Sequence, residues 1–262
     1  MPTPIPEFES EDAEREFWAT HDSTEYVAWG SAERATFPNL KPSAQTTNMA
    51  NSTRPPWREA AQAHMHAATL IELRGRHGTD QVSFNYRWEH VTAVVALALR
   101  LAELTRADDA TVEAAAWLHD VCKFSHGEQH PQAGAAFARD FLPTTDFPPG
   151  KIEAVAEAIA DHMGLWRDEP LTVLESQVLW DADKLAKIGL TAVFHWTGGA
   201  LAGSRMHTLE RLIHRARAND WLPRTVASMH TAPASRAAAA RLDAFQHLYD
   251  ALERELTGDD LI

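Results

Sequence analysis

Four side chains combine the residue types and the order that a metal site needs. His119 and Asp120 stand together after the apolar run 114–118, His90 precedes them, and Asp183 follows in a second apolar segment. Burying an unpaired imidazole or carboxylate costs on the order of several kcal/mol, and a bound divalent metal removes that cost. Imidazole and carboxylate ligands together suit a borderline transition metal such as Mn, Fe, Co, Ni or Zn.

The His119–Asp120 pair limits how a metal could be bound. Neighbouring side chains on a helix point about 100° apart, so the two can bind one metal only from its two flanks. This arrangement is feasible at the end of a helix. We therefore predict a buried helix that ends at this pair, with Asp109 or Thr111 capping its start.

The segments that carry these residues have helical periodicity from Trp57 onward. Apolar residues recur at steps of three and four, and no alternating run of useful length indicates a strand. The fold class predicted is therefore all-α, with His90 opening the second helix of this part. We predict helices over residues 58–75, 89–104, 111–122, 130–141, 151–162, 174–190, 209–217 and 236–256.

The composition excludes several classes of protein. Against 24 Lys and Arg stand 37 Asp and Glu, which leaves a net charge of −13 and argues against a general nucleic-acid or anionic-membrane surface. The single cysteine, Cys122, excludes an internal disulfide and fits a reducing compartment. No apolar run approaches the roughly 18–20 residues of a membrane span, and there is no apolar signal core. We expect a cytoplasmic protein without a membrane partner.

The N-terminal segment differs from the rest. Residues 1–50 contain nine acidic and three basic side chains. Prolines interrupt this segment; only 11–20 is predicted to be helical, and 36–52 to be a loop. We predict two domains: an irregular acidic arm over residues 1–56 and a helical domain over residues 57–262.

The order His, His-Asp, Asp resembles the HD-domain superfamily of metal-dependent phosphohydrolases. The resemblance covers about residues 60–256 and is carried by segments 88–91, 114–123, 159–162 and 178–185. It implies an HD-domain helical bundle. It also implies a first set of metal ligands: His90, His119, Asp120 and Asp183.

Within this resemblance, Asp183 is preferred over Asp181 because the family's last carboxylate stands in an Ala-Asp-Lys/Arg-Leu context. His130 and His162 match the places where binuclear HD proteins have further histidines, with His126 as a competitor for the role of His130. One or two ions are therefore implied. The alternative that His130 and His162 only cap helices or support ligands from behind stays open.

Two metals about 3.5–4 Å apart could bridge a hydroxide through Asp120 and activate it for attack on phosphorus. In related proteins the lysine at the position of Lys123 approaches the substrate phosphate, where a cation offsets developing charge. The alternative is a lysine at a helix C-terminus, favoured by the helix dipole. Asp120 and Lys123 are the predicted catalytic residues. Arg87 and Lys184 are weaker candidates, since each could be a solvated charge.

The resemblance implies hydrolysis of a small phosphate ester, with a nucleotide among the candidates. Two alternatives remain: a mixed-valent di-iron HD oxygenase, and a non-catalytic HD scaffold that binds a partner protein. HD proteins often pair through apolar helix faces, so a homodimer is a further open alternative.

Segments 14–26 and 37–43 resemble the N-terminal part of CopG/BrnA-type antitoxins, over about residues 7–43. In those proteins this part leads into a ribbon-helix-helix DNA-binding unit, whose strand and amphipathic helices are missing from 44–57. DNA binding therefore does not carry over, and we interpret the arm as an antitoxin-like remnant. A loosely packed arm and a toxin-binding segment are the open alternatives, and Met49 is a candidate internal start.

Overall fold

A computed structural model describes residues 3–6, 8, 10–21, 26, 54–202 and 208–261 of the chain. The chain divides into two units, residues 1–51 and residues 52–262. The predicted domain boundary between residues 56 and 57 stays a prediction. The predicted loop over 36–52 lies outside the described residues.

The first unit contains the helix α1 (Glu11–Thr20), as predicted. Its N-cap is Ser10, whose hydroxyl accepts a hydrogen bond of 3.2 Å from the Ala13 N–H. The ring of Phe17 lies at the centre of a small aromatic cluster, stacked on His21 with 4.0 Å between ring centroids. In this unit, α1 therefore has a side-chain N-cap and aromatic contacts with residues near it in the sequence.

The second unit is helical, and its described residues contain no strand, which confirms the all-α prediction. No helix in the described part of the chain is long and apolar enough to cross a membrane. The α-helices are α2 (Trp57–His77), α3 (Tyr86–Thr105), α4 (Asp109–Leu118), α5 (Lys123–His126), α6 (His130–Phe141), α7 (Ile152–Asp161), α8 (Leu174–Leu185), α9 (Leu190–Leu201), α10 (Leu209–Arg217), α11 (Leu222–Ala227) and α12 (Ala232–Thr257). Short 3₁₀ helices are η4 (Gly127–Gln129), η5 (Leu142–Thr144), η6 (Pro149–Lys151) and η7 (Asp259–Leu261).

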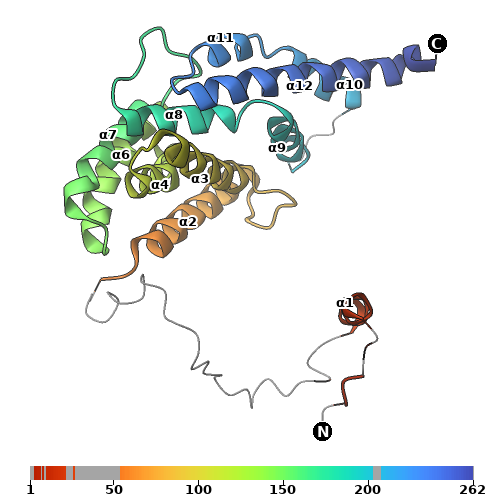
Figure 1. Cartoon of the computed structure of the whole chain (residues 1–262), viewed down its shortest axis with the longest axis horizontal. Helices are drawn as coiled ribbons and strands as arrows, with labels where there is room; N and C mark the ends of the chain where they lie inside the picture. The colour runs from red at the N-terminus through yellow and green to blue at the C-terminus, as the bar shows by residue number, and fades with distance from the viewer. Residues whose placement is uncertain are drawn as a thin grey trace. The chain divides into compact units, whose positions relative to one another are not determined.

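Four helices, α3, α4, α7 and α8, form the centre of this unit. α3 and α7 each pack against both α4 and α8. Around them, α6 lies against α7, α2 against α4, and α12 against α8 and α9 (Figure 1). The alanines at 114–116 are fully buried, and their small side chains allow the neighbouring helices to approach α4 closely.

The buried helix predicted before the His-Asp pair is α4, but it ends at Leu118, not at Cys122. Its N-cap is Asp108, rather than Asp109 or Thr111, because the Asp108 carboxylate accepts a hydrogen bond of 2.9 Å from the Thr111 N–H. The residues that follow Leu118 form a turn that leads into α5. Since Asp120 lies in this turn, the pair is not held to the angular separation of helical neighbours.

The helix predicted over 174–190 is α8, which ends at Leu185, and a separate helix, α9, begins at Leu190. The break lies at Gly189, whose φ of 85° is in the left-handed region that favours glycine. A Cβ at this position would lie 2.8 Å from the Cβ of Arg241 on α12. Neither α9 nor α11 is predicted from the sequence. α3 begins at Tyr86, so His90 lies inside this helix and does not open it.

Asp181 on α8 ties this helix to the segment before α12. Its fully buried carboxylate accepts hydrogen bonds from the backbone N–H groups of His230 (2.9 Å) and Thr231 (2.8 Å) and from the Thr231 hydroxyl (2.8 Å). The His230 Nε2 accepts from the Leu171 N–H at 2.9 Å, so Nδ1 carries the ring proton and donates to Asp181 at 3.2 Å. Asp181 is thus a structural acceptor in this fold.

Replacing this acceptor should destabilise the fold. Asp181→Ala leaves four donor groups without their acceptor in a buried place, so we expect the free energy of unfolding to fall by about 3 kcal/mol. Urea unfolding followed by circular dichroism measures this change. Asp243→Ala, on an exposed position of α12, is the matched control and should change the value by less than about 0.5 kcal/mol. Equal effects of the two substitutions would contradict this account of Asp181.

Candidate metal centre

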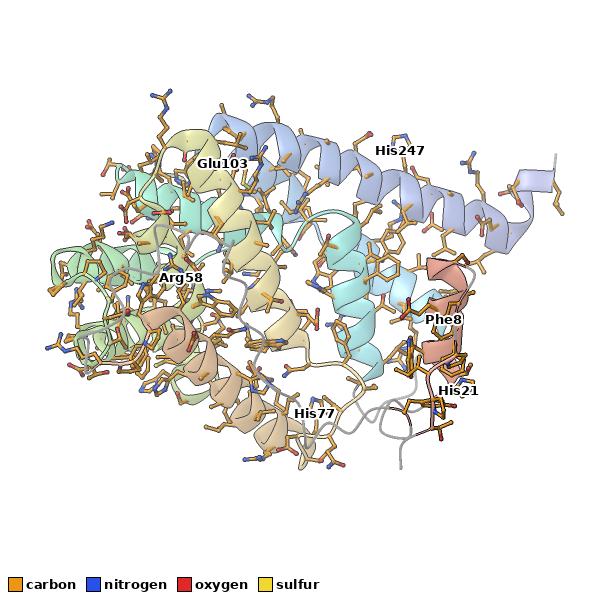
Figure 2. All side chains as sticks on the ribbon, turned by 60° about the horizontal axis from the view of Figure 1, so that its bottom comes forward. Phe8, His21, Arg58, His77, Glu103 and His247 are labelled. Atoms are coloured by element: carbon orange, nitrogen blue, oxygen red, sulfur yellow. The ribbon has the colours of Figure 1, made fainter. Side chains whose placement is uncertain are left out.

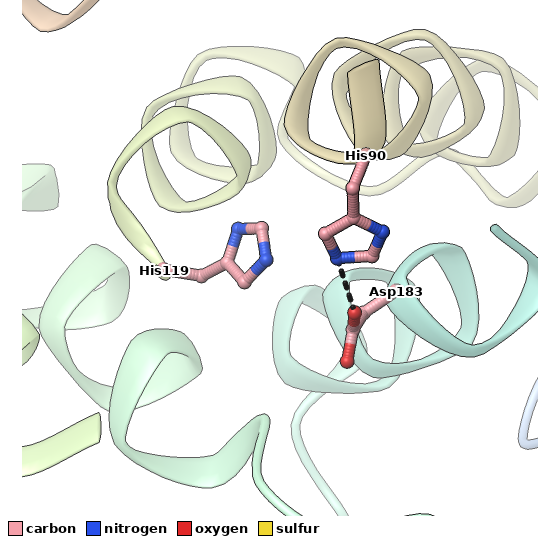
Figure 3. A group of neighbouring side chains, drawn as sticks. All are labelled: His90, His119 and Asp183. Atoms are coloured by element: carbon pink, nitrogen blue, oxygen red, sulfur yellow. Dashed lines mark ion pairs between the residues drawn. The ribbon is translucent and has the colours of Figure 1, made fainter. Parts of the chain in front are cut away.

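The helices bring six of the predicted ligand side chains together in two groups of three. The first group contains His90 on α3, His119 after α4 and Asp183 on α8. Their ligand atoms lie within 4.8 Å of one another, and all three residues are buried. Figure 3 shows the rings of His90 and His119 and the carboxylate of Asp183 directed toward one space, with 3.1 Å between His90 Nε2 and Asp183 Oδ1.

The second group contains Asp120, His130 at the start of α6 and His162 directly after α7, all buried. Asp120 Oδ1 lies 3.3 Å from His130 Nε2 and 3.7 Å from His162 Nε2. The two Nε2 atoms are 3.1 Å apart. Residues distant in sequence therefore converge on one carboxylate oxygen.

Asp120 lies between the two groups. Its Oδ2 is 3.7 Å from the Nε2 of His119 in the first group, while its Oδ1 faces the second group. The sequence places Asp120 with the first set of ligands. In the structure it also stands beside His130 and His162. A carboxylate with one oxygen toward each group has the geometry of a bridging ligand.

The three histidines outside α3 share one way of fixing their rings. The Nδ1 atoms of His119, His130 and His162 lie 2.7, 2.6 and 2.5 Å from the backbone carbonyl oxygen three residues earlier. A carbonyl can only accept, so each Nδ1 carries the proton and each Nε2 keeps a lone pair. Ligand histidines in metal sites are typically oriented by such a hydrogen bond from the other ring nitrogen.

Several buried ring nitrogens have no hydrogen-bond partner. Those within the two groups are Nδ1 and Nε2 of His90 and Nε2 of His119, since the His90–Asp183 contact lacks hydrogen-bond geometry. Buried polar atoms are nearly always paired. In the second group the Nε2 atoms of His130 and His162 lie 3.1 Å apart, and the Lys123 ammonium lies 3.1 Å from the Nε2 of His130. The residues therefore fit a divalent metal.

Burial keeps the histidines neutral. It lowers the pKa of His119 to about 3, and it also lowers the pKa values of His90 and His162, although nearby carboxylates oppose the shift. Neutral imidazole is the form that binds a metal. The site therefore holds these rings ready for a metal at neutral pH.

Arg87 on α3 holds Asp120 ionised. Its guanidinium forms an ion pair with Asp120 Oδ2 and lies 3.0 Å from a carboxylate oxygen of Glu72. Burial raises the pKa of Asp120, but the charge of Arg87, together with His119, His130 and His162, more than offsets this effect, and the pKa lies well below its usual range. The side chain of Arg87 is 12% exposed, so the prediction that it could be a solvated charge is wrong.

Two lysines surround Asp183. Lys184 Nζ contacts Asp183 Oδ2 and donates to the backbone carbonyl of His162 at 2.8 Å, so it connects the two groups. Lys187 Nζ lies 2.6 Å from Asp183 Oδ1. Burial raises the pKa of Asp183, but these two charges hold it well below its usual range. Burial lowers the pKa of Lys184 to about 8. Lys187 is not predicted from the sequence, although its spacing of four from Asp183 on a helix is a signal that could have found it.

Lys123 faces the second group. Its Nζ lies 3.1 Å from His130 Nε2, and the side chain is half-buried. Lys123 begins α5, a helix of four residues whose last turn also contains Lys123, so the alternative of a lysine near a helix C-terminus stays open. His126, the predicted competitor of His130, is exposed and contacts Ser125 at 2.8 Å, outside both groups.

Comparison with protein families gives two matches. Residues 87–188 match the HD domain, and residues 3–52 match the CopG antitoxin of type II toxin–antitoxin systems. Among curated proteins, none matches the chain.

Solved structures give a consistent result. A predicted HD-superfamily hydrolase from an uncultured Thermotogales bacterium matches with a TM-score of 0.52 and 22% identity, over 78% of this chain and 94% of that one. YpgQ of Bacillus subtilis matches with a TM-score of 0.54 and 20% identity, over 77% and 96% of the two chains. An HD-superfamily hydrolase of Bacillus thuringiensis matches with a TM-score of 0.54 and 19% identity, over 77% and 98%.

Identities at this level show the fold. Both resemblances predicted from the sequence are confirmed, that of the N-terminal segment to CopG-type antitoxins and that of the helical part to the HD superfamily. The helical unit therefore has the fold of these HD-superfamily structures, and residues 87–188 are the part of it that matches the HD-domain model.

Proposed function

We propose that this chain is a metal-dependent phosphohydrolase that acts on a small phosphate ester. The observation that carries the proposal is the convergence of two buried three-residue groups on Asp120. The HD-superfamily fold supports the same reading.

The two groups divide the proposed ligand set. His90, His119 and Asp183 would hold one divalent transition metal, and His130 and His162 would hold a second. Asp120 would be shared. When bound, the ions would activate a water molecule as the nucleophile and offset negative charge on the phosphoryl oxygens.

The chain's own residues supply the remaining functions. Arg87 fixes the orientation of Asp120, so that each carboxylate oxygen stays directed at one group. Lys123, with its Nζ beside His130, can bind a phosphoryl oxygen and offset the charge that develops on it. Asp120 and Lys123 are therefore the residues that we propose to act in catalysis.

A nucleotide is a reasonable member of the substrate class. The structure of Bacillus subtilis YpgQ in complex with ADP matches this chain with a TM-score of 0.53 and 20% identity, over 77% of this chain and 98% of that one. This complex supports a phosphorylated ligand for the present fold.

The same six ligands would also suit a mixed-valent di-iron oxygenase of the HD type. The position of Lys123 favours phosphate chemistry, because a cation at 3.1 Å from a ligand histidine is suited to bind an anionic ester. A scaffold that only binds a partner protein would not need the fixed rings of His119, His130 and His162.

The first prediction from this proposal concerns turnover. Asp120→Asn keeps the size of the side chain but removes its charge, so p-nitrophenyl phosphate hydrolysis at saturating Mn²⁺ should fall by at least about a hundredfold. Asp140→Asn, on an exposed position of α6, should retain wild-type activity. Circular dichroism establishes that both variants are folded. Near-wild-type turnover by Asp120→Asn at saturating metal would exclude the proposed role of Asp120.

The second prediction concerns metal content. Protein purified without chelator should contain about two equivalents of transition metal by elemental analysis, one for each ligand group. The double variant His130→Ala/His162→Ala should contain about one, and the exposed control His126→Ala should keep two. Equal content in wild type and double variant would make the extra histidines structural. Two irons per chain together with oxygen consumption would favour the oxygenase, and no metal after reconstitution would favour the binding scaffold.

The third prediction concerns pH. The pKa of His119 in the folded protein, about 3, lies below the unfolded value of 6.5, so the unfolded state binds more protons as the pH falls through 6.5. The metal-free protein should therefore lose about 2 kcal/mol of unfolding free energy per such histidine between pH 7 and pH 5. The pKa values of Asp120 and Asp183 lie well below their usual range, so these two carboxylates stay ionised across this window.

Urea unfolding in the presence of EDTA at several pH values measures this loss. His119→Asn should remove about one histidine's share of the pH dependence, whereas the exposed-site variant His126→Asn should keep the wild-type slope. Identical slopes for wild type and His119→Asn would show that this ring is not held neutral by the fold.

A further inference from the structure

A cavity of about 490 Å³ lies beside the candidate metal centre, between α2, the start of α3, α9 and α10. Its volume is in the range of about 300–1,000 Å³ that is typical of small-molecule sites. Figure 2 shows His77, one of its lining residues, at the end of α2 next to the loop that leads to α3. None of the six ligand residues lines this cavity.

The inner wall of the cavity contacts both ligand groups. Arg87 lines the cavity and forms the ion pair with Asp120. Tyr86 lines it as well, and its ring is parallel to that of His90, with 6.1 Å between centroids and 4° between ring planes. One layer of side chains therefore separates the cavity from the residues that would hold the metals.

The charge of the cavity is opposite to that of the whole chain. Its lining includes Arg76, Arg87 and Arg215, whereas Glu72 is the acidic side chain among the lining residues. Glu72 is paired with both Arg76 (2.8 Å) and Arg87 (3.0 Å). Arg215 makes no ion pair with any residue in the described ranges. In a chain of net charge −13, this positive surplus favours an anionic ligand.

An aromatic wall completes the cavity. Trp196 of α9 lines it and is held from behind by Trp221 and Phe245, with ring centroids 6.2 and 6.0 Å away. A fixed indole offers a flat face on which a ring can stack. Trp196 and Arg215 lie outside residues 87–188, the range that matches the HD-domain model. This wall is therefore formed by a part of the chain that the family model does not cover.

We propose that this cavity binds the part of the substrate that extends from the scissile phosphate. This inference rests on the proposed phosphohydrolase function. The ligand class is a phosphate ester that contains an aromatic ring and a second anionic group: the ring stacks on Trp196, and the second anionic group is bound by Arg215 together with Arg76. Arg87, engaged with Asp120, lies on the side of the reacting phosphate.

Binding is tested first, on the full chain in the presence of EDTA, because a bound metal would itself attract phosphates. Isothermal titration calorimetry compares adenosine with ADP, which share a ring and differ in charge. We expect wild type to bind ADP more tightly. Arg215→Ala should weaken ADP binding at least tenfold and adenosine binding less than twofold. Trp196→Leu should weaken both.

Arg211→Ala is the matched control. Arg211 is exposed one turn earlier on α10 and does not line the cavity, so this variant should bind ADP like wild type. The inference is wrong if Arg215→Ala and Arg211→Ala behave alike, if adenosine binds wild type as tightly as ADP does, or if wild type binds neither.

Activity separates this inference from the proposed function. With Mn²⁺ present, the ratio of kcat/KM for ADP to that for p-nitrophenyl phosphate should fall at least tenfold in Arg215→Ala. An unchanged ratio would overturn the role of Arg215 while leaving the phosphohydrolase intact. If wild type hydrolyses neither compound, the proposed function fails, and the calorimetric comparison alone then decides whether the cavity binds a ring with a second anion.

Discussion

The cost of removing charged and polar ligand side chains from water is the constraint on which the rest of this structure depends. Six imidazole and carboxylate groups lie in a helical core, where each group left unpaired would cost several kcal/mol. The sum of these costs would be on the order of the whole stability of a domain. The fold meets part of this cost with contacts around the site. Backbone carbonyls orient three of the four rings, and Arg87, Lys184 and Lys187 neutralise the two carboxylates.

These contacts also explain the arrangement of the helices. α3 supplies both Arg87 and His90, so one helix positions a ligand and the counter-charge of another ligand. Lys184 reaches from α8 to the carbonyl of His162, which couples the carboxylate of one group to the backbone of the other. A shift of a single central helix would therefore change the positions of ligand side chains in both groups, because the two groups share neighbouring residues.

Local patterns explain which features could be predicted. α6 and α10 have their predicted bounds, because periodicity and nearby proline or polar residues mark them. The break between α8 and α9 could not be predicted, since the apolar pattern continues across it and only Gly189 marks the turn. The ordered motifs predicted which six side chains would gather. The burial of Arg87 could not be predicted from periodicity, because it depends on Glu72 and Asp120, 15 and 33 residues away. The cavity wall formed by Trp196 and Arg215 likewise exists only after α9 and α10 pack.

The buried carboxylate of Asp181 depends on residues that are synthesised much later in the chain. Asp181 lies two residues before Asp183 on α8, yet the donors that satisfy its buried carboxylate follow it by 49 and 50 residues. During synthesis from the N-terminus, α8 and its ligand Asp183 are therefore made well before His230 and Thr231, whose N–H groups offset the cost of burying Asp181. Until residues 230–231 are synthesised, burial of α8 would leave the Asp181 carboxylate without these donors. The ligand groups are therefore fully stabilised only after the segment before α12 has been synthesised.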